Sequence, residues 1–427
     1  MKIGIYTPIH KINWEQLDFL VESLRRQTYK DFFWRIVLNG QALNSENLIK
    51  RRYSDIRISC IQSKESNNIG HLKYYGVRWV QQGNEAEIAL ELDYDDALHP
   101  TCLEEVVKAA KENPKAQFFY SNFAHFDKND ATKSTIYGWY YGWKYRRHKS
   151  PLFDLELNEM IAFPAGPQYL QRIESAPNHL RAFRIEAYNK VGGYNEDLEV
   201  GDDHDLMCRF FIEYGEEGFY HIDKCLYYQR YDRTSTTFTK NKEIQIQVDL
   251  NYQKYSEKMF LKWTEDNKLP ALDFGGRFNC PEKYKSVDLL DADYIADLNN
   301  IWPWGTSSIG IIRAYHLLEH LNDPIHFFNE AYRVLVPGGL LMVEVPSMRH
   351  PMAFADPTHK TFWTELNFEY FTNEDKARFI RPQYEGYFQK RRIVEYAWPD
   401  TTLVISAQLL CFKGWYKKRY WGAPPKL

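Results

Sequence analysis

At 427 residues the chain is too long for one ordinary core, and about 150 residues per domain predicts two or three domains. The composition is that of a globular protein, with 44% apolar and 26% charged residues, and the 16% of aromatic residues suggests surfaces that stack on sugars or bases. A net charge of −3, with acids and bases interspersed, disfavours nucleic acid and anionic membranes as partners.

The six cysteines stand far apart without a CxxC pair, so neither a zinc ribbon nor a disulfide framework is indicated. The first residues enter a strand pattern at once, and no run of about 18 apolar residues occurs. We therefore expect a cytoplasmic protein without a transmembrane segment.

The first hundred residues alternate between strand and helix patterns. The patterns predict strands at 2–8, 32–40 and 87–96 and helices at 14–27 and 72–83. Such alternation predicts a parallel sheet covered by helices, with ligands beyond the carboxyl ends of the strands. The polar sequences "YTPIH", "LNGQ" and "DYDD" fall at those ends.

Farther along, the periodicity fades between residues 131 and 173, where crowded aromatic, proline and glycine residues predict long loops over a site. Residues 243–266 have a helical period that places Tyr252, Tyr255, Met259 and Trp263 on one face. We expect a first domain at 1–240, a helical linker at 241–268 and a second domain at 269–427.

The second domain repeats the alternation with different sequences. Strands are predicted at 271–276, 285–291 and 340–347, a strand leading into a helix at 308–321, a helix at 324–335, and a turn at "PGG". Because no internal repeat links the halves, the expected fold class is α/β with two different doubly wound domains in tandem.

Three carboxylates, Asp93, Asp95 and Asp96, follow the strand "IALEL". Aspartates at such a strand end can hold Mg²⁺ or Mn²⁺, which then bridges to substrate phosphates. The alternative is that Asp95 or Asp96 caps the helix predicted in residues 99–113.

Residues 1 to about 240 resemble an inverting family 2 glycosyltransferase of the GT-A fold. Four segments carry the resemblance in the expected order: "IYTPIH", "NNIGHLKYYGV", "LDYDD" and "GGYNEDLEVGDDHDLMCRF". The resemblance implies a nucleotide-diphosphate sugar as donor and a glycan hydroxyl as acceptor. The residues that it implies for nucleotide-sugar binding are Thr7, Pro8, His10, Asn39, Asn68, Gly70, Lys73, Asp93 and Asp95.

Within this set, Asn39 stands where the family usually has an acid near the base, and Lys73 stands where arginine is common. A solvated helix face is the alternative for Lys73. The resemblance implies that Asp93 reaches the ribose or sugar and that Asp95 ligates a metal that neutralises the departing diphosphate.

The resemblance also assigns the general base to Asp203, because inversion needs a base on the face opposite the leaving group. Asp203 belongs to a second acidic cluster, Asp202, Asp203 and Asp205, of which Asp205 is the candidate helix cap. Downstream, "CLYYQRYDRTSTT" resembles the family's closing segment, in which a histidine often completes the metal site. Here Asp232 stands near that position and His221 lies upstream, so both are candidate third ligands.

In the second domain, "LDFGG" followed by "SVDLLD" has the form of a strand, a glycine turn and a strand that ends in an acid. Such a turn lets a cofactor approach the backbone, while the acid accepts hydrogen bonds from ribose. A tight turn without a ligand is the alternative.

Residues 270 to 375 resemble a short form of class I S-adenosylmethionine (SAM) methyltransferases, through "LDFGG", "RAYHLLEHLNDP", "EAYRVLVPGGLLMVEVPS" and "DPTHKTFW". The resemblance implies that Asp273, Gly275 and Gly276 line the methionine side, Asp288 the ribose and Asp297 the adenine. Candidates for acceptor contact or proton removal are His316, Glu319, His320 and His359, although Glu319 and His320 could equally cap and pack their helix.

The leading hypothesis is a bifunctional enzyme with Mn²⁺ or Mg²⁺ and SAM as cofactors. Its first domain would transfer a sugar with inversion, and its second domain would O-methylate a sugar. Two alternatives stay open: a glycosyltransferase whose inactive methyltransferase-like domain binds acceptor or mediates assembly, and a non-enzymatic carbohydrate-binding protein, suggested by aromatic residues between Tyr137 and Tyr169.

Overall fold

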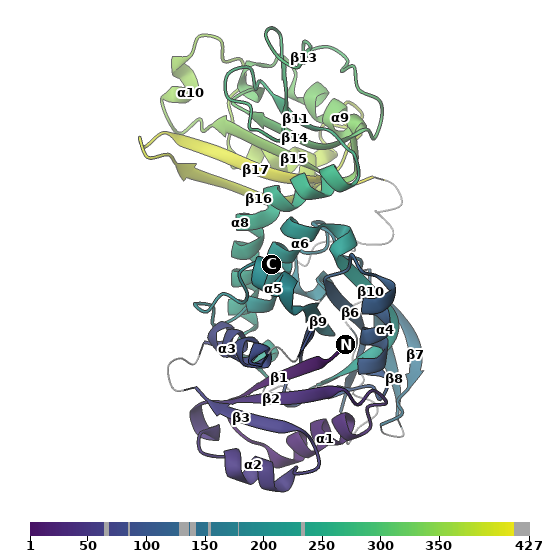
Figure 1. Ribbon diagram of the computed structural model, residues 1–427. Helices are drawn as coiled ribbons and strands as arrows, with labels where there is room; N and C mark the ends of the chain where they lie inside the picture. Colours follow the sequence, from purple (N-terminus) through teal and green to yellow (C-terminus); the bar gives the residue numbers. More distant parts are fainter. Residues whose placement is uncertain are drawn as a thin grey trace. The chain divides into compact units, whose positions relative to one another are not determined.

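The computed structural model divides the chain into two compact units, residues 1–259 and 260–427 (Figure 1). It describes residues 1–63, 68–83, 86–127, 136, 142–152, 155–177, 179–231 and 235–413. Both units combine helices with one sheet, so the expected α/β class with two tandem domains is confirmed. The predicted domain limits at 240 and 268 stay a prediction; the division at Met259 falls inside helix α8 (Asn241–Asp266).

The first unit is built on a ten-stranded mixed sheet in the order β3-β2-β1-β4-β9-β6-β10-β5, with β8 paired to β6 and β7 paired to β8. Strands β1, β2, β3 and β4 run parallel, so their carboxyl ends meet at one edge. The strands are β1 (Ile3–Ile9), β2 (Phe32–Leu38), β3 (Ile58–Gln62), β4 (Ile88–Glu91), β5 (Ala97–Leu98), β6 (Phe118–Phe126), β7 (Lys144–Lys149), β8 (Glu156–Ile161), β9 (Arg181–Arg184) and β10 (Phe219–Arg230).

The predicted strands and helices of this unit form, and the strands are buried because both faces of a parallel sheet are covered. Asn13 accepts hydrogen bonds from the backbone N–H groups of Glu15 and Gln16 and so caps the first helix. The helices are α1 (Trp14–Arg25), α2 (Glu46–Arg52), α3 (Ile69–Gln81), α4 (Cys102–Glu112), α5 (Ile185–Lys190), α6 (Asp202–Tyr214) and α7 (Thr236–Thr239).

The pattern missed several short elements. Helix α2 and strand β3 form although neither was expected, and the hairpin β7–β8 lies in the stretch predicted as loops. Strands β3, β7 and β8 are short, so pairing with neighbouring strands of the sheet decides them more than local preference does. Residues 131–135 and 137–141 of that stretch lie outside the described residues.

The second unit has a seven-stranded sheet in the order β13-β12-β11-β14-β15-β17-β16, parallel through β15 and antiparallel beyond it. Its strands are β11 (Ala271–Phe274), β12 (Lys285–Asp288), β13 (Tyr294–Ile295), β14 (Ile309–Tyr315), β15 (Leu335–Pro346), β16 (Phe388–Ala397) and β17 (Leu403–Cys411). Its helices are α9 (Pro324–Val334), α10 (Met352–Ala355), α11 (Glu369–Thr372) and α12 (Glu374–Ala377).

Two expectations for this unit were wrong. The helix predicted to follow β14 is only a 3₁₀ turn at Leu318–His320, and the "PGG" turn is incorporated into β15, where the register with β14 shifts. Gly338 has φ of +80° at that irregularity, a conformation that glycine adopts without strain. Among the described residues, no helix is long and apolar enough to span a membrane.

Candidate functional site

The predicted acidic motif follows β4 at the carboxyl edge of the first sheet. The chain turns after Leu92, and the backbone N–H of Asp96 donates to the carbonyl of Asp93 at 3.1 Å. The side chain of Asp93 is 38% exposed, whereas Asp96 is buried. The motif therefore presents Asp93 outward and turns Asp96 into the protein.

Asp96 does not cap a helix. Its carboxylate accepts hydrogen bonds from the Tyr227 hydroxyl at 2.7 Å and from the Arg230 backbone N–H at 2.8 Å, both on β10. The N-cap of α4 is Thr101, and no side chain caps that helix. Burial, with Asp95 and Asp93 nearby, raises the pKa of Asp96 well above its usual range. Asp96 therefore ties the motif to β10, and the metal candidate Asp95 lies beside it, its carbonyl accepting from Arg230 at 3.1 Å.

Arg181, the first residue of β9, joins the two acidic clusters of the first unit. Its Nη2 donates to Glu91 at 2.5 Å and to Asp93 at 3.2 Å, and its Nη1 donates to Asp203 at 3.1 Å. The antiparallel register of β4 and β9 pairs Glu91 directly with Arg181. Asp93 and Asp203, far apart in sequence, thus share one guanidinium.

Lys73 forms a second ion-pair bridge, between Glu91 and Asp202. Its Nζ lies 2.9 Å from Glu91 and 2.8 Å from Asp202, and it is only 5% exposed, so the solvated-face alternative was wrong. Burial would lower the pKa of Lys73, but Asp202 and Glu91 raise it above its usual value. For Asp202, burial outweighs Lys73 and raises the pKa to about 6.

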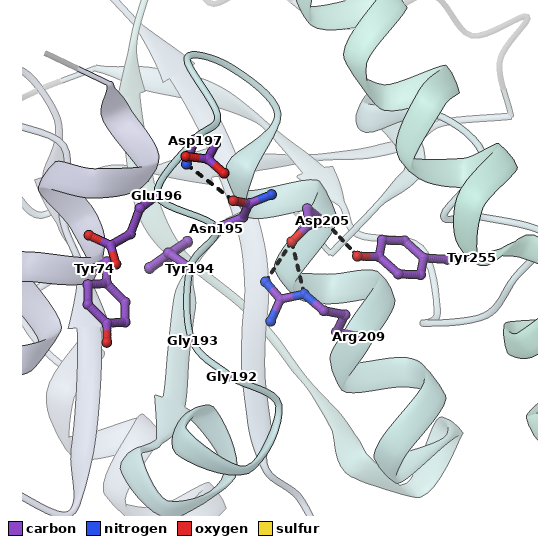
Figure 2. Close-up of a pocket in the computed structure, with 10 residues that line it drawn as sticks. All are labelled: Tyr74, Gly192, Gly193, Tyr194, Asn195, Glu196, Asp197, Asp205, Arg209 and Tyr255. Atoms are coloured by element: carbon purple, nitrogen blue, oxygen red, sulfur yellow. Dashed lines mark hydrogen bonds and ion pairs between the residues drawn. The ribbon is translucent and has the colours of Figure 1, made fainter. Parts of the chain in front are cut away.

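The predicted base, Asp203, lies in the first turn of α6, with its Oδ1 accepting from the backbone N–H of His204 at 2.7 Å. Asp205 is not the helix cap that was expected. Its carboxylate instead accepts from Arg209 at 2.6 and 2.9 Å and from the Tyr255 hydroxyl of α8 at 2.9 Å (Figure 2). The buried Asp205 therefore anchors α8 to α6.

The predicted nucleotide loop lies at the same sheet edge. Thr7 is fully buried, and its hydroxyl donates to the Leu92 carbonyl at 2.7 Å and accepts from the Trp34 indole at 2.9 Å. His10 is exposed beyond β1, 3.3 Å from the side-chain nitrogen of Asn39. Thr7 thus holds the loop through buried hydrogen bonds. Of the other two predicted residues of this loop, Pro8 is half-buried and His10 is exposed.

Asn68 is the N-cap residue of α3 and Gly70 lies in its first turn, and both contact the segment before α6. The Gly70 N–H donates to the Leu198 carbonyl at 3.0 Å, and a Cβ on Gly70 would lie 2.0 Å from the Asn195 carbonyl oxygen. The Asn68 amide donates to the carbonyls of Glu196 and Asp197 at 3.5 and 3.4 Å. Both residues hold α3, which the resemblance places on the donor side, to residues 192–201, which it places on the acceptor side. We call these the donor-side helix and the acceptor-side segment, and their contacts with substrates stay predictions.

The structure does not bring His221 to the acidic motif. His221 lies near the start of β10, stacked on Tyr120 and 2.7 Å from Asn122. Arg230, which contacts Asp95 and Asp96, ends that strand nine residues later, roughly 25–30 Å away at the rise of a strand. His221 is thus excluded as a ligand beside Asp95, and the other candidate, Asp232, lies outside the described residues.

The candidate SAM site lies at the carboxyl ends of β11, β12 and β14. Gly275 has φ of +80° and donates to the Val287 carbonyl at 2.8 Å, so the glycine turn joins two neighbouring strands. A Cβ on Gly276 would lie 2.4 Å from the Asp273 carboxylate. Asp288 ends β12 and Asp297 is exposed after β13. The turn and the acids therefore lie at one sheet edge, and their contacts with a cofactor stay predictions.

Sequence reasoning missed Arg313 at this edge, whereas it had named His316, His320 and His359 as candidates. Arg313 donates to Asp273 at 2.7 Å and stacks over the Tyr315 ring, so Asp273 already has a cationic partner. His316 follows β14 with φ of +53°, and its ring nitrogens lie 3.4 Å from Glu319 and from Glu344. The rings of His320 and His359, from segments 39 residues apart, meet at 4.8 Å.

Comparison with known families identifies both halves. Residues 5–173 match the model of glycosyl transferase family 2, and residues 278–343 match the model of a methyltransferase domain. The chain joins a family 2 glycosyl transferase domain to a methyltransferase domain. Both resemblances are thereby confirmed.

Individual relatives are distant. The chain is 25% identical over 229 residues to Uncharacterized protein y4gI of Sinorhizobium fredii, a match that covers 53% of this chain and 22% of that protein. The crystal structure of S. aureus TarS gives a TM-score of 0.43 at 11% identity and covers 62% of this chain and 42% of TarS. TarS 1-349 in complex with UDP-GlcNAc gives 0.44 at 11% identity and covers 62% and 71%.

The glycosyl transferase domain also contains a pocket of ≈ 430 Å³ beside its acceptor-side segment. Glycines 192 and 193, the run from Tyr194 to Asp197, and the Asp205–Arg209–Tyr255 group line it (Figure 2). Tyr194 connects the pocket to the buried cluster, because its hydroxyl donates to Glu91 at 2.5 Å. In the sequence, the only signal for this pocket was the acidic pair Glu196 and Asp197.

Proposed function

We propose that the glycosyl transferase domain transfers a sugar from a nucleotide-diphosphate sugar to a glycan hydroxyl with inversion, with Asp203 as general base. The observation that carries this proposal is the Arg181 guanidinium, which contacts both Asp93 of the donor motif and Asp203 of the acceptor segment. Asp93 and Asp203 are thus held on one rigid group. One guanidinium sets the separation between Asp93 and Asp203. This separation suits a base, Asp203, that approaches the sugar from the side opposite the diphosphate.

A divalent cation fits the donor side. Glu91, Asp93, Asp202 and Asp203 place four carboxylates around two cations, Arg181 and Lys73, which leaves an excess of negative charge before Asp95 is counted. Asp95 would hold Mn²⁺ or Mg²⁺, which prefer oxygen ligands and keep positions for phosphate oxygens and water. When bound, such a cation neutralises the charge that develops on the leaving diphosphate.

The chain's own residues position the reacting groups. Arg181 orients Asp93 toward the donor and Asp203 toward the acceptor hydroxyl, whose proton Asp203 takes as the sugar–oxygen bond forms. Lys73 holds Asp202 and Glu91 beneath them, which fixes the start of α6 against β4. Charged pairs inside a protein keep such geometry only when each partner is present.

The test is transfer and donor hydrolysis with Mn²⁺ and a panel of nucleotide sugars. Asp203→Asn should lower transfer by about 10²–10⁴-fold while leaving donor binding in place. Glu199→Gln is the matched control, because Glu199 is an exposed acid on the same segment. Transfer by Asp203→Asn at the wild-type rate would remove the proposed base.

We propose further that the methyltransferase domain O-methylates a sugar hydroxyl from SAM. The glycine turn after β11 and the acid that ends β12 fit a nucleoside-bearing cofactor. When bound, SAM supplies the methyl group. Calorimetry with SAM should show about tenfold weaker binding to Asp288→Ala and no change for Glu282→Ala, an exposed acid of the same unit.

A binding-only methyltransferase domain is the second candidate, and one observation favours it. Asp273, expected on the methionine side, is ion-paired to Arg313 at 2.7 Å. If this pair closes the methionine end, the domain would hold acceptor glycan without transferring methyl groups. Wild-type protein that gives no heat with SAM would support this candidate over O-methylation.

A further inference from the structure

We propose that Glu319, His320 and His359 form a binding site for a divalent transition metal of the Zn²⁺ type in the methyltransferase domain. One ligand atom from each residue can be chosen so that all three lie within 4.8 Å of one another. Two imidazoles and one carboxylate suit Zn²⁺ rather than Mg²⁺ or Ca²⁺, and three protein ligands leave a fourth position for water or a substrate oxygen.

Glu319 is the first argument for a cation. The residue is 2% exposed, and neither carboxylate oxygen has a hydrogen-bond partner among the described residues. The His316 ring nitrogen lies 3.4 Å from Oε1. The His316 ring faces Oε1 and is shared with Glu344, so a coordinated cation would supply the direct bond that Oε2 of this buried carboxylate lacks.

The second argument is the tautomer of each histidine. The Nδ1 of His359 lies 2.8 Å from the Ala353 carbonyl, which can only accept, so Nδ1 carries the proton. In the neutral ring Nε2, which lies 4.0 Å from the Asp356 carboxylate, keeps its lone pair. The Thr358 hydroxyl donates to Asp356, so it accepts from Nδ1 of His320 at 2.9 Å. Both Nε2 atoms are thereby prepared as metal ligands, each ring oriented by a hydrogen bond from its other nitrogen.

The third argument is that the two segments are fixed to each other. The Glu319 carbonyl accepts from the backbone N–H groups of Lys360 and Thr361, and the Thr361 hydroxyl donates to the Leu318 carbonyl at 2.9 Å. The 3₁₀ turn and the segment around His359 therefore form one scaffold. Tetrahedral zinc bonds place ligand atoms roughly 3.3–3.6 Å apart, so closure needs side-chain movements of about 1 Å.

The proposed metal site lies at the same sheet edge as the candidate SAM site. Glu319 and His320 follow β14, at the sheet edge where the glycine turn and Asp288 also lie. A cation there would hold a substrate oxygen at its open position near the proposed cofactor. This role rests on the proposed O-methylation, whereas metal binding itself does not.

The test uses the whole, metal-stripped chain titrated with Zn²⁺ alone, with bound zinc counted by elemental analysis, and with Co²⁺ as a spectroscopic probe. A histidine-rich four-coordinate site gives cobalt a stronger visible absorption than an oxygen-only site, which separates it from the Asp95 motif. We expect one zinc and the cobalt spectrum to be lost in His359→Ala and in the half-exposed His320→Asn and both to be kept in His350→Ala, whereas Asp95→Asn should keep the cobalt spectrum.

A substitution outside the ligand set sharpens the test. Thr358→Val removes the acceptor that orients His320, and should weaken zinc binding by about 10–100-fold without removing a ligand. Wild-type protein that shows no such cobalt spectrum, or a zinc count and cobalt spectrum that are unchanged in both histidine variants, overturns the proposal. Because no SAM is present, this result is independent of whether the domain methylates.

Discussion

At the scale of single residues, Arg181 decides how the glycosyl transferase site is arranged. Its terminal nitrogens contact Glu91, Asp93 and Asp203 within 3.2 Å, and it is 6% exposed. A planar guanidinium can hold three acids in fixed directions, which the single ammonium of lysine cannot. Burial would raise the pKa of Glu91, but Arg181 and Lys73 hold it well below its usual range.

Two substitutions of Arg181 should therefore behave differently. Arg181→Ala leaves the buried Glu91 with Lys73 as its remaining cation and should lower the free energy of unfolding by about 3–5 kcal/mol in a denaturant titration. Arg181→Lys keeps one charge and should cost less stability, yet lower sugar transfer by about 10²-fold, because Asp93 and Asp203 lose their common orientation.

The matched control is Arg184→Lys, on the same strand. Arg184 donates to the carbonyls of Ala116 and Ala110 and contacts no acid of the site, so transfer should persist. Equal transfer by Arg181→Lys and the wild type would contradict the orienting role.

At the scale of elements, the start of α3 depends on a glycine that no side chain can replace. A Cβ at Gly70 would meet the Asn195 backbone oxygen at 2.0 Å, whereas one at Gly76, within the same helix, would meet the Tyr6 ring at 3.1 Å. A backbone oxygen held by a neighbouring segment yields less easily than a side chain.

Gly70→Ala should thus destabilise the protein by about 1–3 kcal/mol, more than Gly76→Ala does. The same substitution should weaken nucleotide-sugar binding, because it moves the donor-side helix away from the acceptor-side segment. Thermal unfolding and donor titration of both variants measure this; a smaller loss for Gly70→Ala than for Gly76→Ala would refute it.

The connection between β5 and α4 contains a pH-sensitive histidine. The Nδ1 of His99 accepts the backbone N–H of Thr101 at 3.2 Å, which requires a neutral ring. Burial, with His148 nearby, lowers the pKa of His99 to about 4. Because the folded protein binds this proton less readily than the unfolded chain, the stabilisation is complete above pH about 6.5 and is lost as pH falls toward 4.

His99→Gln should remove part of that acid sensitivity. We expect the variant to lose about 1–2 kcal/mol less stability than the wild type between pH 6.5 and 4, a value reduced for the partial exposure of the ring. Unfolding free energies measured across this range give the comparison. Parallel pH profiles of the two proteins would show that His99 does not titrate as described.

At the scale of the whole molecule, the two units carry separate candidate ligands. The acidic motif and Asp203 lie in residues 1–259, and the glycine turn and Asp288 lie in residues 260–427. A ligand that binds only the folded state stabilises by about 2.7 kcal/mol at one hundred times its dissociation constant. Each ligand should stabilise its own unit.

Thermal unfolding should accordingly respond to Mn²⁺ with a nucleotide sugar and, independently, to SAM. Asp95→Asn should abolish the first response and keep the second, and Asp288→Ala should do the reverse. If Asp95→Asn also removed the response to SAM, the two sites would not be independent.

The sequence alone determined the main elements and families of this protein. Alternating strand and helix patterns identify both α/β domains because period and strand-end polarity are local properties. The strand-end motifs also placed Asp93, Asp95, Gly275 and Asp288 at sheet edges. The cytoplasmic location and the binding roles of the predicted residues stay predictions.

Only the tertiary structure decided which side chains meet. Arg181 has no motif of its own; it reaches Glu91 and Asp93 because β9 runs antiparallel beside β4 in one register. The length of β10 separates His221 from Asp95, and the short turn after β14 brings Glu319 and His320 to His359. Strand order and register bring together residues that lie far apart in sequence, and no local pattern records them.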